Sequence, residues 1–245
     1  MAVWALIGFM GCGKSSIGRL VASFCGLGGS PLREFPAAAK AAGRKMAENL
    51  PGAMAFIDLD TEIEVREGRS IPEIFAAAGE AGFRAIERET LASLLAAGIP
   101  PSGVRFAHPT TPWGRSPRYR TAGVTSLSGG SQPPIDILLS LGGGTLTDEG
   151  SRELVKKNCK CIYLRASVET LAANLREDGA AAGRPMLAGA NPDAPADAPD
   201  SLESCITAMM AVRGPIYEKA ADIILDIDGL SYEQAARQIL NSFSL

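Results

Sequence analysis

The chain has 245 residues, of which 46% are hydrophobic and 21% are charged, and its formal net charge is −3. This composition is that of a globular protein large enough for one α/β domain with insertions. The sequence has no basic block and no apolar run near the roughly 18 residues of a membrane span, so we expect neither nucleic acid nor a membrane as partner. The first apolar run begins at residue 3, which leaves no room for a leader, so we expect a cytoplasmic protein.

The five cysteines are odd in number and form no C-x-x-C pair, so we expect neither disulfides nor a zinc site. Cys159 and Cys161 lie two residues apart in an expected strand, and we interpret them as packing side chains on one face.

The first motif is the run Gly8-Phe9-Met10-Gly11-Cys12-Gly13-Lys14-Ser15, which matches G-x-x-x-x-G-K-[ST]. A strand-like run at 3–7 precedes it, and a helix is expected from Ser15 to about Cys25. Glycine backbones can wrap closely around an anion, with N–H groups and a helix N-terminus directed at it. The motif therefore predicts a nucleoside triphosphate site, with Lys14 at the β- and γ-phosphates and Ser15 on Mg²⁺. An ordinary glycine-rich turn is the alternative.

A second strand is expected over 54–60, and alternation places Asp58 and Asp60 on one face at its carboxyl end. Ligands of open parallel sheets bind beyond that end. Two carboxylates there are costly unless a cation or a substrate hydroxyl uses them. We therefore expect Asp58 to help hold Mg²⁺ through water, and Asp60 to accept a hydrogen bond from the hydroxyl to be phosphorylated. Two solvated acids at a strand end are the alternative.

Helices are expected over 61–67, from Ser70 to Gly79 after a capping box, and over 80–97. Arg84 and Glu87 lie one turn apart on the last of these helices. If they have no functional role, we expect them to form an exposed i,i+3 ion pair. A buried strand over 135–141 then runs into Gly142, Gly143 and Gly144 without an acidic residue, which leaves metal binding to Ser15 and Asp58. Three glycines let a ligand approach the backbone, although a simple turn has the same composition.

The rest of the chain continues the alternation of strands and helices. Small residues around Arg184 predict a mobile lid over about 177–190, which would bring this arginine onto the transferring phosphoryl group. A helix over 201–221 is expected to be interrupted near Arg213-Gly214-Pro215. The pattern predicts a three-layer α/β/α fold with a parallel sheet, as a single domain over 1–245 with insertions at 30–53 and 99–134. The remaining expected elements are a helix from 147, a strand at 159–164, a helix at 167–176, a strand at 221–226 and a helix at 231–242.

Several separated motifs line up with one another. Besides the phosphate loop they are Asp58 to Glu64, Ser70 to Phe75, Gly79-Glu80-x-x-Phe83-Arg84-x-x-Glu87, Gly142 to Gly144, Gly183 to Leu187, and Arg213-x-Pro215-x-Tyr217. Together they resemble the shikimate kinase family, over most of the chain except 30–53, 99–134 and about 190–200. The resemblance implies a P-loop kinase fold with a five-stranded parallel sheet in the order 2-3-1-4-5.

The resemblance also implies ATP-dependent phosphorylation of the 3-hydroxyl of shikimate, with Mg²⁺, in the route to chorismate and aromatic amino acids. The catalytic residues that it implies are Lys14, Asp60 and Arg184, and the metal ligands are Ser15 and Asp58. The implied ATP-binding residues are Gly11, Cys12, Gly13, Lys14, Ser15, Ser16, Arg176 and Arg184. The implied shikimate-binding residues are Asp60, Phe75, Phe83, Arg84, Glu87, Gly142, Gly143, Gly144 and Arg213.

In this interpretation Arg84 and Arg213 clamp the substrate carboxylate through guanidinium forks, which lysine could not reproduce. Glu87 orients Arg84, the two phenylalanines wall the ring, and Arg176 packs over adenine. Asp60 positions the 3-hydroxyl and can take its proton.

Two other functions stay open on the sequence alone. One is another small-metabolite kinase of the same fold, such as a gluconate kinase, which the two arginines and the glycine triplet disfavour. The other is a nucleotide-binding regulator that has lost catalysis and acts through 99–134. We expect a monomer, with an oligomer formed through the insertions as the alternative.

Overall fold

The computed structural model describes residues 2–25, 54–96, 136–177, 187, 198 and 201–243. Within them, five parallel strands form one sheet in the order β2-β3-β1-β4-β5, as predicted. The strands are β1 (Val3–Ile7), β2 (Met54–Asp58), β3 (Asp136–Ser140), β4 (Lys160–Arg165) and β5 (Ile223–Asp226). The central strand β1 pairs Val3 with Ile137 on one side and Ala5 with Cys161 on the other.

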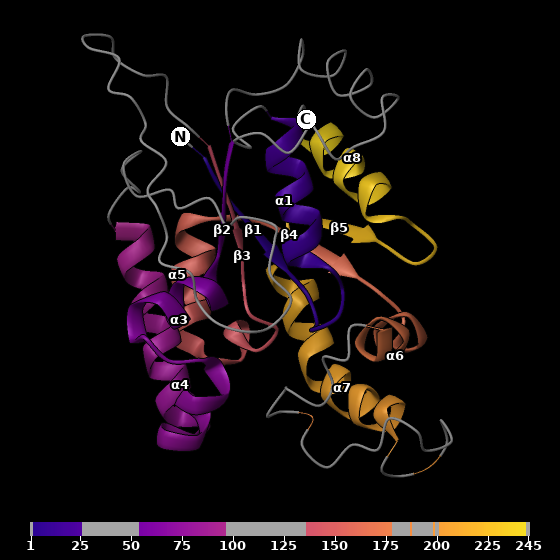
Figure 1. Cartoon of the computed structure of the whole chain (residues 1–245). Coiled ribbons are helices and arrows are strands. Elements are labelled where there is room, and N and C mark those ends of the chain that lie inside the picture. Colours follow the sequence, from indigo (N-terminus) through magenta and orange to yellow (C-terminus); the bar gives the residue numbers. More distant parts are fainter. Residues whose placement is uncertain are drawn as a thin grey trace, which may run out of the picture.

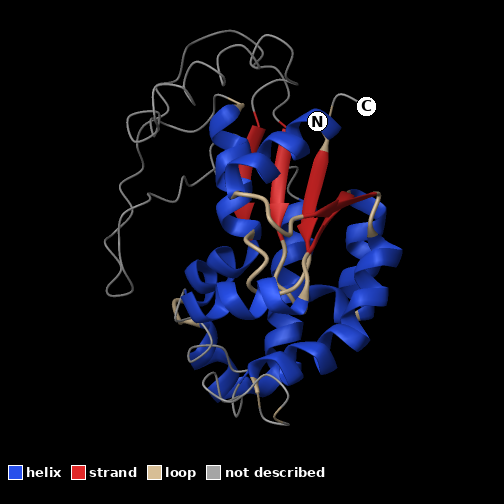
Figure 2. Cartoon of the chain, turned by 90° about the vertical axis from the view of Figure 1, so that its right-hand side faces the viewer, coloured by secondary structure: helices blue, strands red, loops and turns tan. Residues whose placement is uncertain are grey.

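Helices lie on both faces of this sheet (Figures 1 and 2). The elements are α1 (Lys14–Phe24), α3 (Leu59–Glu67), α4 (Ile71–Ala96), the 3₁₀ turn η1 (Thr145–Thr147), α5 (Glu149–Asn158), α6 (Val168–Glu177), α7 (Leu202–Ala220) and α8 (Tyr232–Ser242). Tyr163 of β4 faces α7, where its ring lies 5.2 Å from that of Tyr217. Trp4 of β1 lies on the opposite face, 4.6 Å from the ring of Phe243 at the end of α8. The predicted three-layer architecture is therefore confirmed for the described part of the chain.

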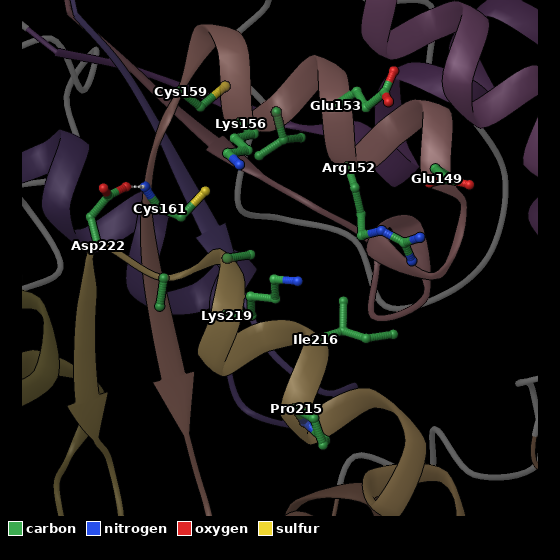
Figure 3. A pocket seen from close by; sticks show the side chains of 13 residues that line it. Glu149, Arg152, Glu153, Lys156, Cys159, Cys161, Pro215, Ile216, Lys219 and Asp222 are labelled. Atoms are coloured by element: carbon green, nitrogen blue, oxygen red, sulfur yellow. Dashed lines mark hydrogen bonds between the residues drawn. The ribbon is translucent and has the colours of Figure 1, made fainter.

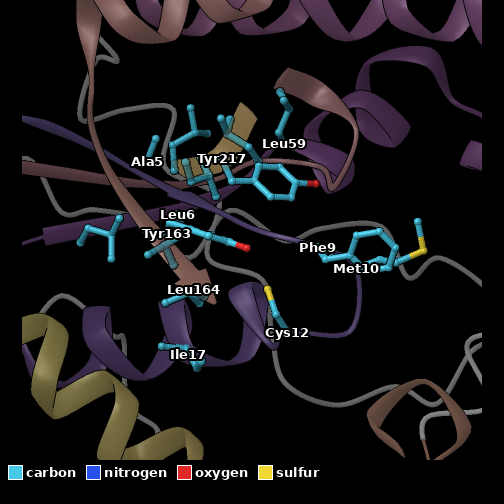
Figure 4. Close-up of a cluster of buried hydrophobic side chains, with 14 of the residues drawn as sticks. Ala5, Leu6, Phe9, Met10, Cys12, Ile17, Leu59, Tyr163, Leu164 and Tyr217 are labelled. Carbon is cyan, nitrogen blue, oxygen red and sulfur yellow. The ribbon is translucent and has the colours of Figure 1, made fainter. Parts of the chain in front are cut away.

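The buried core runs under the carboxyl end of β1 and continues into the loop that follows it (Figure 4). Phe9 and Cys12 within the glycine-rich loop, and Ile17 just after it, are each at most 1% exposed. Gly18 of α1 lets the helix approach β2, because a Cβ there would lie 2.2 Å from the ring of Phe56. The phosphate-loop region is thus fixed by packing on both sides of β1.

Two sequence predictions about these elements are wrong. Strand β2 ends at Asp58, and Asp60 lies in the first turn of α3, so the two acids do not share a strand face. The Asp58 side chain itself ends the strand, because it accepts a hydrogen bond from Thr61 N at 3.2 Å and caps the helix. Helix α7 also continues through Pro215 without the expected interruption. Proline has a helical φ and removes one backbone hydrogen bond, and Arg213 and Tyr217 are buried on either side of it.

Other boundaries agree with the prediction. Gly79 has φ 66° and ψ −175°, a conformation that favours glycine, and it divides α4 where the sequence predicted a helix end. No helix in the described ranges is long and apolar enough to cross a membrane. The predicted insertions at 30–53 and 99–134 lie outside the described residues, as do Arg184 and most of the predicted lid at 177–190, so the single-domain organisation stays a prediction.

Candidate active site

The candidate site lies at the carboxyl ends of β1, β2 and β3, where the phosphate loop, the start of α3 and the glycine triplet meet. The loop turns through three glycines with positive φ: Gly8 at 145°, Gly11 at 82° and Gly13 at 79°. Side chains at these positions would be strained and would also meet neighbouring atoms. A Cβ on Gly13 would lie 2.7 Å from the ring of Tyr232, at the start of α8. The loop conformation therefore requires glycine both for the backbone and for packing.

Lys14 is already held inside this loop. Its Nζ donates hydrogen bonds of 2.9 Å to the carbonyl oxygens of Gly8 and Phe9, and lies 3.6 Å from Cys12 Sγ. The side chain is only 8% exposed. Ser16, on the first turn of α1, is exposed. The ammonium group is thus fixed where N–H groups at a helix N-terminus favour an anion.

Ser15 and Asp58 bring two hard oxygen donors together beside Lys14. Ser15 Oγ donates a hydrogen bond to Asp58 Oδ2, while Asp58 Oδ1 receives Thr61 N. Within the described ranges, no cluster of three or more histidine, cysteine or acidic residues could enclose a metal. A site with one hydroxyl and one carboxylate fits Mg²⁺, because this ion usually keeps several waters and takes its other ligands from substrate phosphates.

Asp60 reaches the glycine triplet from α3, despite the wrong prediction of its local structure. Its Oδ1 lies 2.9 Å from the point where a Cβ on Gly142 would stand, and Glu87 Oε1 lies at the same distance from that point. The three glycines are each approached closely by a different group. A Cβ on Gly143 would lie 3.0 Å from the backbone N of Met10, and one on Gly144 would lie 2.0 Å from Nη2 of Arg84.

Arg84 and Glu87 form a largely buried ion pair, in which the Arg84 side chain is 13% exposed, so the interpretation as an exposed pair is wrong. Arg84 Nη1 donates to Glu87 Oε2 at 2.6 Å, and Glu87 is fully buried. The second carboxylate oxygen of Glu87 accepts a 2.5 Å hydrogen bond from Thr145 Oγ1, directly after the glycine triplet. The sequence pattern could not show this burial, since it depends on α4 packing against η1.

Two aromatic side chains stand beside this arginine. The rings of Phe75 and Phe83 are stacked with centroids 4.5 Å apart, and the Arg84 guanidinium lies 5.3 Å from the Phe83 ring. Phe83 is 4% exposed and Phe75 is partly buried. An apolar wall and a cation therefore meet at one edge of the site.

Helix α7 brings a second arginine to the triplet. Arg213 is 5% exposed, its Nη1 donates to Gly143 O at 3.4 Å, and its guanidinium lies 5.7 Å from the ring of Phe9. Tyr217, one turn later, also donates its hydroxyl proton to Gly143 O. Burial raises the pKa of this phenol well above its usual range, so it remains a donor. The motif contained Tyr217, but no role was predicted for it.

On the nucleotide side, α6 packs directly on the phosphate loop. Asn174 Nδ2 donates to Gly11 O at 2.8 Å, and a Cβ on Gly11 would lie 2.9 Å from Leu175. Arg176 forms two hydrogen bonds with Glu203 of α7, of 2.6 and 2.9 Å. No sequence signal identified Asn174, because its contact depends on how α6 docks.

A separate cavity of about 610 Å³ lies between α5 and α7, near the amino ends of β4 and β5 (Figure 3). Cys161 and Asp222 line it, and Asp222 Oδ2 accepts a 2.7 Å hydrogen bond from Cys161 N. Its position separates it from the candidate site at the carboxyl ends. Three basic and three acidic side chains border it, so charge selects no class of ligand: Arg152, Lys156, Lys219, Glu149, Glu153 and Asp222.

The fold and the site together define a P-loop phosphotransferase with a small-molecule site beside the phosphate loop. The sequence profile described as shikimate kinase matches residues 38–100 and 118–244. The chain belongs to the shikimate kinase family. The family assigns ATP-dependent phosphorylation of shikimate, in aromatic amino acid biosynthesis, as the reaction class.

The similarity to individual relatives supports this family assignment. The chain is 31% identical to the shikimate kinase of Stenotrophomonas maltophilia over 198 residues, which is 81% of each protein. It is 30% identical to that of Chlorobaculum tepidum over 238 residues, covering 96% of this chain and 88% of the relative. In fold it is similar to the shikimate kinase of Acinetobacter baumannii solved in complex with shikimate, with a TM-score of 0.61, 21% identity, and coverage of 99% and 93%.

Proposed function

We propose that this protein transfers the γ-phosphoryl group of ATP to the 3-hydroxyl of shikimate, with Mg²⁺ as cofactor. The observation that supports shikimate as the acceptor is that two arginines from different helices meet at one glycine triplet. Arg84 of α4 lies against Gly144, and Arg213 of α7 reaches Gly143 O. Two convergent guanidinium groups suit a carboxylate, because each fork can donate two parallel hydrogen bonds.

The ring of the acceptor would lie against Phe75 and Phe83, which form the apolar wall next to Arg84. A cyclic polyol acid needs such a wall on one side and hydrogen-bonding groups on the other. Asp60 supplies one of these groups, since its carboxylate lies beside Gly142.

The positions of these groups define the roles that each would have in the chemical step. The acceptor oxygen attacks the γ-phosphorus, the bond from that phosphorus to the β,γ-bridging oxygen breaks, and ADP leaves. Asp60 orients the hydroxyl and accepts its proton. Lys14, which is held at the loop by Gly8 O and Phe9 O, would turn to the phosphate oxygens and neutralise charge that develops on them.

The metal would be held by Ser15 directly and by Asp58 through water. Mg²⁺ supplies charge neutralisation at the phosphates when it is bound. Asp58 is suited to this position because its capping bond with Thr61 N fixes the carboxylate. The remaining nucleotide contacts in this proposal are the backbone from Gly11 to Ser16, Arg176 over adenine, and Arg184 on the transferring group.

Three predictions about the protein as a whole accompany this proposal and remain predictions. They are a cytoplasmic location, a monomeric state and the absence of a nucleic-acid partner. The net charge of −3 supports the last of these.

The experiment is an ADP-release assay with ATP and Mg²⁺, in the presence of shikimate or of gluconate, on the wild type and on Asp60→Asn. We expect turnover that depends on shikimate and falls at least a hundredfold in the variant. ATP protection against thermal unfolding, measured on both proteins, is the control for folding. Turnover with gluconate alone, or ATP binding without any turnover, would refute the proposed acceptor.

A further inference from the structure

Glu87 is a fully buried carboxylate with both oxygens in use. Oε2 receives Arg84 Nη1 at 2.6 Å, and Oε1 receives Thr145 Oγ1 at 2.5 Å. Thr145 is also fully buried. Such short hydrogen bonds to a buried charged group are stronger than bonds at the surface.

The hydroxyl of Thr145 is committed to this one acceptor. Thr145 opens η1 directly after the triplet, and its backbone N donates to Gly142 O at 3.1 Å, which fixes the start of the turn. A threonine hydroxyl has a single proton to donate, and Glu87 receives it. The carboxylate is therefore held from the triplet side by Thr145 and from the α4 side by Arg84.

We propose that Thr145 is a positioning residue for the acceptor site, which acts through Glu87 to fix the guanidinium of Arg84. The inference rests on the proposed function, in which Arg84 binds the substrate carboxylate. With Glu87 held at both oxygens, the Nη1 edge of Arg84 is fixed, while its Nη2 lies against Gly144 and 3.4 Å from Glu80 Oε1. A guanidinium fixed in this way loses little conformational freedom when substrate binds, which favours affinity.

The same hydrogen bond joins two of the elements that build the acceptor site. Arg84, Phe75 and Phe83 all belong to α4, whereas the glycine triplet continues into η1. The Thr145–Glu87 bond spans these elements over 58 residues of sequence. Its loss should therefore change the acceptor site and leave the phosphate loop unaffected.

The test compares Thr145→Val, which removes the hydroxyl but keeps the shape, with Thr145→Ser, which restores it. We expect the valine variant to raise the KM for shikimate about tenfold, with the KM for ATP unchanged within about twofold. The serine variant should return the KM for shikimate to within about threefold of the wild type. Thr145→Ala is a second variant without the hydroxyl, in case the valine does not fit.

Thr90→Val is the matched control. Thr90 lies three residues after Glu87 on the same helix, is 3% exposed, and its hydroxyl has no hydrogen-bond partner among the described residues. The same substitution there removes a buried hydroxyl without touching Glu87. Both KM values should stay within about twofold of the wild type, and thermal melting should show no loss of stability.

A double-mutant cycle tests the route through Glu87. In a Glu87→Ala background, Thr145→Val should change the KM for shikimate by less than about twofold, because the hydroxyl has nothing left to hold. A wild type that ignores shikimate would refute the proposed function before any variant is measured. If the wild type is active and Arg84→Lys raises the KM for shikimate, an unchanged KM in Thr145→Val and Thr145→Ala overturns the inference about Thr145.

Discussion

Nη2 of Arg84 lies 2.0 Å from the position that a Cβ on Gly144 would occupy, so the guanidinium fills the space of the missing side chain. The other two glycines of the triplet are needed for different reasons. Gly142 leaves room for the carboxylates of Asp60 and Glu87, and Gly143 lets the backbone of Met10 approach. The three glycines thus adjoin the groups that we assign to acceptor binding and to the phosphate loop.

Gly144→Ala should weaken acceptor binding without unfolding the protein. The backbone φ of −113° suits alanine, and the obstacle is the movable end of an arginine side chain. We expect the KM for shikimate to rise about tenfold while the KM for ATP changes less than about twofold. Steady-state kinetics with each substrate varied in turn measure both values.

Gly143→Ala provides the contrast, because its methyl would meet the backbone N of Met10 at 3.0 Å. Backbone cannot move aside as a side-chain tip can, so we expect a loss of about 1–3 kcal/mol in the free energy of unfolding. A normal KM for shikimate in Gly144→Ala would contradict the assignment of Arg84 to the acceptor.

Arg84→Lys should raise the KM for shikimate far more than the KM for ATP. Lysine keeps the charge but loses the planar fork that pairs with Glu87 and with a carboxylate. We expect a rise of about 10- to 100-fold, measured by ADP release at saturating ATP. Arg88→Lys is the control, since Arg88 lies one turn along α4, is 47% exposed and pairs with Asp148. Equal changes in both KM values for Arg84→Lys would refute its assigned role.

The sequence predicted the elements around the site well because their signals are local. The glycine-rich loop between strand and helix, the break at Gly79 and the capping box at Ser70 all depend on residues close together in the chain. The strand order came from the resemblance, since periodicity alone does not fix which parallel strands are neighbours. The error at Asp60 arose because a strand pattern continued over residues that the Asp58 cap turns into a helix.

Tertiary contacts explain what the sequence could not show. Nothing near Glu87 in the chain indicates that it is buried, because its second partner is Thr145 on another element. The position directly after the triplet was the only available hint for Thr145. Pro215 was expected to break α7, whereas Arg213 and Tyr217 both reach Gly143 O only if that helix is continuous.

The thiols of Cys159 and Cys161 should resist alkylation in the folded protein. Burial raises the pKa of each to about 12, and for Cys161 the neighbouring Cys159 and Asp222 add to the effect. The thiolate is the reactive form, and it is absent near pH 8 at such values. We expect iodoacetamide at pH 8 to modify these two residues only after denaturant is added, as followed by mass spectrometry of peptides.

The same shifts predict how stability depends on pH. An unfolded thiol loses its proton near pH 8.5, whereas the folded thiols keep theirs up to about pH 12. The unfolded state therefore binds fewer protons above pH 8.5, and the free energy of unfolding should fall from pH 8 to 9.5. Urea titrations of the double variant Cys159→Ala and Cys161→Ala should show a smaller fall in the free energy of unfolding over this pH range. A fall equal to that of the wild type would show that these thiols do not cause the pH dependence.

Asp58→Asn and Asp58→Ala should separate metal binding from helix capping. Asparagine can still accept the hydrogen bond from Thr61 N, so the cap on α3 remains, but the negative charge near Ser15 is lost. We expect Asp58→Asn to melt close to the wild type while the Mg²⁺ concentration for half-maximal activity rises at least tenfold. EDTA should abolish wild-type turnover, and added Mg²⁺ should restore it.

Asp58→Ala should show the same metal defect together with a loss of about 1 kcal/mol in stability, because the cap is gone as well. Asp148→Ala is the matched control, since Asp148 caps α5 through a 2.8 Å bond from Ser151 N and lies outside the phosphate loop. That variant should lose stability without any change in the Mg²⁺ titration. If the Mg²⁺ titration of Asp58→Asn coincides with that of the wild type, Asp58 only caps α3 and does not help to bind the metal.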